Sequence, residues 1–372
     1  MALEALDPFN VRRQLARLGT LPPVKSAASD VSFLIKAREA LLPLPLVDRP
    51  KPIDPHVFPP LEHRPARALQ GKRIGIVGSG GSGASIALVG MARAFEEAGL
   101  RPAAISACSG SAVWGSMWAA GMTAQEMAEF SLSWRTQDYL DVGWTRLPRV
   151  ALSAMRGFTG VGKGDALERL FDRRLWHMCA GETDIPFHTI VYNLDRGRIE
   201  YFGSADTPDL MLGELVRIAV ALPLLVEAVR VEGHLYVDGG VVDAFPAEPL
   251  LAGDAKFDHV FGLNVLLPPG LEGEDISGWE RGRVGGMVKA GRQLGRASHI
   301  ELARRAKRRL GDRLTLIEPV ELDEVTGLNF YDLFLDRRRW PDLMRRGYEA
   351  THAALEPFRT GTKRGRTAEA GA

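Results

Sequence analysis

Apolar and polar positions follow two alternating patterns between residues 71 and 268. Short apolar runs, as at 72–78 and 101–108, have the length and composition of buried strands. Longer stretches with apolar residues three or four positions apart, as at 84–99 and 163–175, indicate helices with one buried face. The same patterns predict strands at 187–194, 235–240 and 259–268 and helices at 110–121 and 212–222. Because strands and helices alternate with short links, the chain predicts an α/β fold with a mostly parallel central sheet.

The two ends of the chain differ from this pattern. Residues 43–65 are dense in proline, which removes backbone donors and favours an extended linker. The stretch at 31–42 predicts one short amphipathic helix. We therefore expect an N-terminal extension with a Pro-rich linker at 1–70, one folded domain at 71–358 and a flexible tail at 359–372.

Composition and charge narrow the class of protein. Hydrophobic residues make up 45% of the chain and charged residues 25%, which is enough apolar material for a core. The formal net charge of +1 gives no field that would attract nucleic acid, so none is expected as a partner. Two cysteines, Cys108 and Cys179, are too few for a disulfide framework. With no signal-peptide pattern and no run of about 18 apolar residues, we expect a cytoplasmic protein.

One segment departs from this neutral balance. Residues 281–313 carry eleven Arg and Lys side chains against two acidic ones, Glu301 and Asp312. The pattern at 299–313 is that of a helix, and a solvated surface helix is its simplest interpretation. The alternative is a basic face that makes peripheral contact with an anionic membrane.

Ser109 stands where a predicted strand turns sharply into a predicted helix. Around it, "ACSGS" has Ala107 and Ser111 at positions where a nucleophile elbow usually has glycine. Small residues are needed there because the positions two before and two after the nucleophile crowd each other. Ser109 is therefore a candidate nucleophile, although a serine at a turn is by itself a weak signal.

A glycine-rich loop follows the first predicted strand. Residues 78–83, "GSGGSG", fit the G-x-G-x-x-G pattern of a dinucleotide-binding loop, which also requires an acidic residue near the end of the next strand. No Asp or Glu lies between Gly99 and Met122, so this interpretation is a minor alternative. The other interpretation is that the loop amides, which parallel strands bring beside Ser109, stabilise an oxyanion.

A serine nucleophile needs a base, and Asp238 is the candidate. It follows a short predicted strand and precedes two glycines in "LYVDGGVVDAFP", so its carboxylate can lie at the same edge of the sheet. A plain turn is the ordinary interpretation of Asp-Gly-Gly taken alone. None of the eight histidines stands in a recognisable catalytic loop, which disfavours a Ser-His-Asp triad.

Together these motifs resemble the patatin-like phospholipases, a family of lipid acyl hydrolases that use a serine–aspartate dyad. The glycine loop, the helix ending "EEAG" and the elbow align with the family pattern without a gap from Arg73 to Met122. Residues 192–202, 219–246 and 329–355 resemble a later strand, the Asp-Gly-Gly segment and the closing helix. The resemblance spans residues 71–358 and implies a patatin-like, three-layer α/β/α sandwich.

Residue by residue, the resemblance makes Ser109 the nucleophile and Asp238 the base. It maps the oxyanion amides onto the glycine loop, at Gly80, Gly81, Ser82 and Gly83. It implies a lipid or acyl-ester substrate, no cofactor and no metal, and no spacing of metal ligands is visible in the sequence.

The chain departs from the family pattern in this loop. Ala84 replaces an Arg or Lys, and Ser82 and Ser85 replace glycines. Losing a cation beside the oxyanion weakens anion stabilisation or phosphate recognition, so a neutral ester or a thioester is as compatible as a phospholipid. We expect a serine hydrolase of lipid acyl esters, with two alternatives: a small-ester hydrolase or thioesterase, and a catalytically silenced family member.

Overall fold

The computed structural model describes residues 53–139, 141, 160–252, 256–272, 296–326 and 328–360. The helix expected at 31–42, the basic residues 281–295 and the end of the tail, 361–372, lie outside the described residues. Part of the linker contacts the folded domain, since the Arg64 N–H donates to the Glu97 carbonyl at 2.8 Å. The division between extension and domain stays a prediction.

The central sheet is mostly parallel, as predicted, with an antiparallel flank. Its order is β10-β9-β1-β2-β4-β8-β7, and β5 also pairs with β4. Strands β10, β9, β1, β2 and β4 run parallel, whereas β5, β8 and β7 pair antiparallel with their neighbours. The strands are β1 (Ile74–Gly78), β2 (Ala104–Ala107), β4 (Phe187–Asn193), β5 (Arg198–Gly203), β7 (Val229–Val231), β8 (His234–Asp238), β9 (His259–Leu263) and β10 (Leu314–Ile317). A separate two-stranded sheet pairs β3 (Gly160–Gly162) with β6 (Leu224–Val226).

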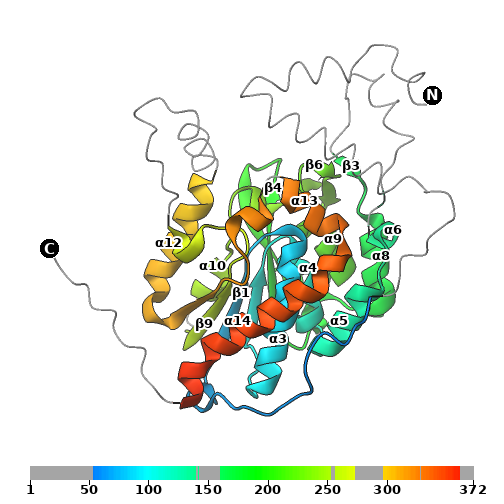
Figure 1. Ribbon diagram of the computed structural model, residues 1–372. Coiled ribbons are helices and arrows are strands. Elements are labelled where there is room, and N and C mark those ends of the chain that lie inside the picture. Colours follow the sequence, from blue (N-terminus) through cyan, green and yellow to red (C-terminus); the bar gives the residue numbers. More distant parts are fainter. Residues whose placement is uncertain are drawn as a thin grey trace, which may run out of the picture.

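Helices cover both faces of the sheet, which confirms the three-layer sandwich (Figure 1). The α-helices are α3 (Ala87–Glu97), α4 (Gly110–Ala119), α5 (Ala124–Ser133), α6 (Thr136–Tyr139), α8 (Asp165–Arg174), α9 (Leu212–Ala219), α10 (Glu248–Leu251), α12 (Ala297–Leu310), α13 (Leu328–Leu335) and α14 (Trp340–Thr360). Short 3-10 turns are η2 (Arg67–Leu69), η3 (Ser82–Ile86), η4 (Ala180–Glu182), η5 (Gly239–Val241), η6 (Pro269–Leu271), η7 (Gly311–Arg313), η8 (Leu322–Val325) and η9 (Arg337–Arg339). Helices α3, α4, α5 and α14 share one hydrophobic core with the sheet, and α10 and α12 share a second core on the other face.

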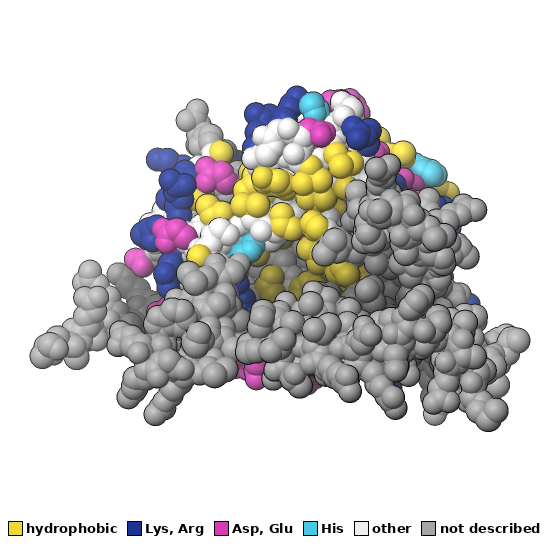
Figure 2. Space-filling model, turned by 90° about the horizontal axis from the view of Figure 1, so that it is seen from above, with side chains coloured by type: hydrophobic (Ala, Val, Ile, Leu, Met, Phe, Trp, Pro, Cys, Tyr) yellow, Lys and Arg dark blue, Asp and Glu magenta, His cyan; other side chains and the backbone are white. Residues whose placement is uncertain are grey.

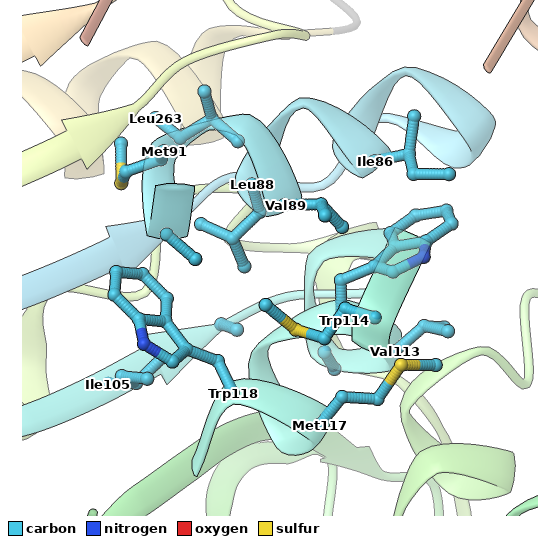
Figure 3. Close-up of a cluster of buried hydrophobic side chains, with 14 of the residues drawn as sticks. Ile86, Leu88, Val89, Met91, Ile105, Val113, Trp114, Met117, Trp118 and Leu263 are labelled. Carbon is cyan, nitrogen blue, oxygen red and sulfur yellow. The ribbon is translucent and has the colours of Figure 1, made fainter. Parts of the chain in front are cut away.

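One face of α4 lies in the larger core. Trp114, Met117 and Trp118 are buried, and Figure 3 shows them packed among side chains of α3 and β2 such as Leu88 and Ile105. This packing anchors the helix that begins just after Ser109.

Two glycines let α3 and α14 cross with their backbones in contact. A Cβ atom added to Gly90 would collide with the carbonyl oxygen of Met344, and one added to Gly347 would collide with the carbonyl of Ala87. The contact fastens the C-terminal helix to the helix that continues the glycine loop.

We therefore predict that Gly90→Ala destabilises the protein. Alanine stabilises an exposed helix by about 1 kcal/mol relative to glycine. Here the collision with the α14 backbone should instead lower the free energy of unfolding by about 1–3 kcal/mol. Chemical denaturation of both proteins measures the change. Glu349→Ala, on the exposed face of α14, is the control and should leave the free energy of unfolding nearly unchanged. A Gly90→Ala protein more stable than the wild type would contradict the prediction.

Candidate active site

The glycine loop runs from β1 into η3 and is held by hydrogen bonds to two neighbouring segments. The Ser79 N–H donates to the Leu263 carbonyl in β9, and the Gly80 N–H donates to the Ala244 carbonyl, both at 2.9 Å. The Ser79 hydroxyl accepts from the Val265 N–H at 3.0 Å. These bonds fix the loop between β9 and the segment that follows β8.

Ser109 occupies a sharp turn between β2 and α4, as predicted. Its φ and ψ are 51° and −124°, a conformation that costs a non-glycine residue roughly 1–3 kcal/mol. The neighbouring residues are small because the loop and β1 press against them. A Cβ on Gly110 would collide with the Ser82 carbonyl, and a Cβ on Gly78 would lie 2.7 Å from the Ser111 Cβ. Close packing thus joins the elbow to the glycine loop.

Strand β4 brings Ser109 and Asp238 together. Ala107, at the end of β2, lies opposite Thr189, while Asp238, at the end of β8, lies opposite Val191. Since β5 pairs with the other side of β4, β2 and β8 share one side and their carboxyl ends face each other. The two pairing positions are two residues apart, roughly 6–7 Å along the strand. Asp238 thus reaches the site by an antiparallel strand that meets β2 end to end.

The Asp238 carboxylate is buried and hydrogen-bonded. It is 1% exposed, and the Gly240 N–H donates to its Oδ1 at 2.8 Å. The Cys108 thiol also donates to Oδ1 at 3.9 Å, and the Ser109 hydroxyl is near enough to lower the pKa of this carboxylate. Burial raises the pKa of Asp238 to about 6, while these hydrogen bonds lower it. Ser109 itself is partly exposed, so the pair opens to solvent through the serine.

Several amides near Ser109 are free to bind a ligand. Among the described residues, no acceptor is found for the N–H groups of Gly81, Ser82 and Gly83, as expected at the start of a helix. The same is true of Gly110, the first residue of α4, which was not among the predicted oxyanion residues. The elbow pattern was the available signal, because the residue after a nucleophile begins the helix. Gly80 differs from the expectation, because its N–H already donates to a carbonyl.

Position 84, where the family pattern has an Arg or Lys, is closed to solvent. Ala84 and Ser85 are fully buried in η3, and the Ser85 hydroxyl donates to the Ser79 carbonyl at 3.5 Å. The loop therefore offers an anion N–H groups rather than a cationic side chain at this position. The N-terminus of α4 adds its dipole at Ser109.

Helix α13 covers the glycine loop. A Cβ on Gly83 would collide with the Leu333 carbonyl, to which the Trp340 indole N–H donates at 2.9 Å. Figure 2 looks onto the end of the molecule where α13 lies, and hydrophobic side chains gather in the middle of this face with Lys and Arg toward its margin. Val241, three residues after Asp238, is 37% exposed. Such an apolar surface suits a substrate with an acyl chain.

A second buried carboxylate, Asp243, was not predicted. It accepts the Phe245 N–H at 2.9 Å, and burial raises its pKa to about 6. It borders a cavity of about 570 Å³ between β5, α10 and α12. Its charge also helps to raise the pKa of the Cys108 thiol, after burial and the charge of Asp238. The only sequence signal was a second Asp in the Asp-Gly-Gly segment.

Among the described residues, the groups that act on the Asp238 carboxylate are Ser109, Cys108 and the Gly240 amide, and none is a histidine. His234, the nearest histidine in sequence, lies at the opposite end of β8 and hydrogen-bonds to Arg196 at 2.8 Å. Within the part of the chain that the structure describes, no group of three or more His, Cys, Asp or Glu side chains is arranged to hold a metal ion. Nor does that part contain a helix with the length and apolar character needed to cross a membrane.

Two relatives in sequence are the lysophospholipase NTE1 of Cryptococcus neoformans and the neuropathy target esterase sws of Drosophila melanogaster. The first is 26% identical over 273 residues, which cover 70% of this chain and 16% of NTE1. The second is 26% identical over 229 residues, which cover 58% of this chain and 15% of sws. The chain thus spans about a sixth of the length of these relatives. The crystal structure of VipD from Legionella pneumophila matches with a TM-score of 0.44 and 16% identity, over 77% of this chain and 67% of VipD.

A family profile matches the part of the chain that holds the site. Residues 76–251 match the Patatin profile, described as patatin-like phospholipase. This stretch contains the glycine loop, the elbow and the Asp-Gly-Gly segment in the order that the sequence analysis aligned with the family. The match identifies residues 76–251, a little under half of the chain, as a patatin-like phospholipase domain.

Proposed function

We propose that this protein is a serine hydrolase that cleaves acyl esters of lipids, with Ser109 as nucleophile and Asp238 as base. The observation that carries the proposal is the meeting of the carboxyl ends of β2 and β8 on one side of β4, which brings Ser109, on its strained turn, near the buried Asp238 carboxylate. The family profile that matches residues 76–251, and the lysophospholipase among the relatives in sequence, support a lipid ester as the substrate.

In the first step, Ser109 Oγ attacks the acyl carbonyl carbon while Asp238 takes the hydroxyl proton. The carbonyl oxygen becomes an oxyanion, which the free N–H groups at the start of η3 and α4 hold. These groups belong to Gly81, Ser82, Gly83 and Gly110. Gly80 is left out because its N–H is already engaged. The intermediate then collapses, the ester C–O bond breaks, and the departing alcohol takes the proton from Asp238.

In the second step, water attacks the acyl-enzyme. Asp238 takes a proton from the water and passes it to Ser109 Oγ as the acyl C–O bond breaks, which releases the fatty acid and restores the enzyme. A base with a pKa of about 6 suits both steps, because it is charged at neutral pH and yet accepts a proton more readily than an exposed aspartate.

Small-ester hydrolysis or thioester hydrolysis is the second candidate. The observation that favours it is the buried Ala84, which gives the loop no cation for a phosphate group. The two candidates differ in the acyl chain that they prefer, since a lipid hydrolase gains binding energy from each buried methylene group.

The proposal extends to a cytoplasmic location and to peripheral contact with an anionic membrane through residues 281–313, of which 296–313 are described. Some of these basic side chains bind to other groups of the protein. Arg304 and Lys307 donate to backbone carbonyls at η6, at 2.9 and 2.8 Å, and Arg309 pairs with a glutamate of α10 at 2.9 Å. Membrane contact through α12 therefore depends on exposed side chains such as Arg305, and on Arg308, whose partner Glu301 is itself exposed.

We predict that replacing either member of the dyad abolishes turnover. Ser109→Ala removes the nucleophile and Asp238→Asn removes the base, and each should lower kcat for p-nitrophenyl esters by roughly four orders of magnitude. Fluorophosphonate labelling should occur in the wild type and disappear in Ser109→Ala. Turnover that rises with acyl-chain length supports the lipid candidate, and a preference for short chains supports the second one.

Ser133→Ala, at an exposed serine of α5, is the matched control and should keep labelling and turnover. Hydrolysis at the wild-type rate by folded Ser109→Ala would refute the assignment. Absence of both labelling and turnover in folded wild type would instead identify a silenced member of the family.

We predict that kcat/KM falls about tenfold per pH unit below pH 6, because a protonated carboxyl cannot accept the serine proton. The position of this acid limb follows from the pKa of about 6 that burial gives Asp238. Asp243 has a similar pKa, so Asp243→Asn is the control and should retain the limb. Loss of the limb in Asp243→Asn would contradict its assignment to Asp238.

We predict that the protein sediments with vesicles containing phosphatidylserine and is released when salt rises from about 0.1 M to about 1 M, since salt screens exposed charges. Replacing Arg305 and Arg308 by Gln should weaken binding, whereas Arg345→Gln, in the exposed face of α14, should not. Binding that is unaffected by salt or by the double variant would count against contact through α12.

A further inference from the structure

Two buried titratable groups near the dyad take no part in the proposed steps, namely Cys108 and Asp243. Cys108 directly precedes Ser109, and its sulfur fills the space between the glycine loop and the Asp-Gly-Gly turn. A Cβ on Gly80 would lie 3.3 Å from this sulfur, and a Cβ on Gly240 would lie 2.7 Å from it. The thiol is thus wedged among backbone atoms and directed at the base.

We propose that Cys108 is a positioning residue, whose S–H group acts with the Gly240 N–H to hold Oδ1 of Asp238 and so orients the carboxylate toward Ser109. This inference rests on the proposed function. The two donors reach the same oxygen, at 3.9 Å from sulfur and 2.8 Å from nitrogen. A partial rotation about the Cβ–Cγ bond would carry this oxygen away from both donors, so the plane of the carboxylate keeps one orientation toward the serine.

The thiol can play this part because it stays protonated. Burial, with the charges of Asp238 and then Asp243, raises the pKa of Cys108 well above its ordinary value. A thiolate would repel the carboxylate, whereas a neutral S–H donates to it. Cys108 therefore supports the base and does not compete with Ser109 as nucleophile.

The groups that act on Asp238 come from three elements in the described residues. They are the Ser109 hydroxyl before α4, the Cys108 thiol after β2 and the Gly240 amide in η5. The charge of Asp243 helps to raise the pKa of Cys108. Burial, and then charges that include those of Asp243 and Cys108, raise the pKa of Tyr201 in β5. Because hydrogen bonds lower the pKa of Asp238 against burial, loss of the S–H donor should raise it.

The test compares Cys108→Ala and Cys108→Ser with wild type, using the pH dependence of kcat/KM for a p-nitrophenyl ester and of the fluorophosphonate labelling rate. Cys108→Ala should move the acid limb up by about half a pH unit and lower the plateau several-fold. Cys108→Ser supplies a stronger donor and should move the limb down. Cys179→Ser, at the half-buried second cysteine, is the matched control and should leave the profile unchanged.

Unshifted limbs in both Cys108 variants, with Asp238→Asn inactive, would overturn the positioning role and leave the proposed function standing. A lower plateau with an unshifted limb would indicate packing alone and would also overturn it. If Cys108→Ala does not fold, the direction of the shift in Cys108→Ser decides the question. Wild type that is neither labelled nor active would defeat the proposed function, and this inference with it.

Discussion

The pairing of β2 and β8 with one side of β4 is the constraint on which the candidate site depends. The Thr189 hydroxyl donates to the Ala107 carbonyl at 3.0 Å, and a Cβ on Gly239 would lie 2.7 Å from the Ile190 backbone. These contacts fix where each strand ends. A shift of one residue in the register of β8 would turn Asp238 toward the other face of the sheet. The geometry of the dyad is therefore a property of the sheet, which holds it more rigidly than a loop would.

The same sheet buries Asp238, the proposed base, and so affects the pKa of its carboxyl group. Burial disfavours the charged form of Asp238, and donors from Ser109, Cys108 and Gly240 favour it. Without the donors, the carboxyl would stay protonated at higher pH and could not accept the serine proton. Without burial, it would be a weaker base. In the proposed mechanism, this balance lets the aspartate take the serine proton itself, with no histidine between them.

The sequence predicted the parts of the site that follow local patterns, because an apolar run ending in small residues marks the elbow and the glycine loop wherever the strands lie. It predicted the mostly parallel sheet for the same reason. It could not predict that β8 is antiparallel, since a short apolar strand has no sequence signature of direction. It also missed what depends on distant contacts: the Gly80 amide is engaged by Ala244, and Asp243 is buried beneath α10 and α12. The roles of Ser109 and Asp238 stay predictions.

The C-terminal helices cover the glycine loop, and this cover explains why position 84 has no cationic side chain. Ala84 is fully buried, Gly83 lies against the backbone of α13, and α14 crosses α3 at Gly90. A long cationic side chain at position 84 would have to displace this cover or lie buried without a counter-ion, at a cost of several kcal/mol. Backbone N–H groups carry no net charge and need no counter-ion. They suit a substrate whose negative charge develops only in the transition state better than one that arrives charged. The packing of α13 and α14 therefore supports the proposal that the loop binds an acyl carbonyl rather than a phosphate.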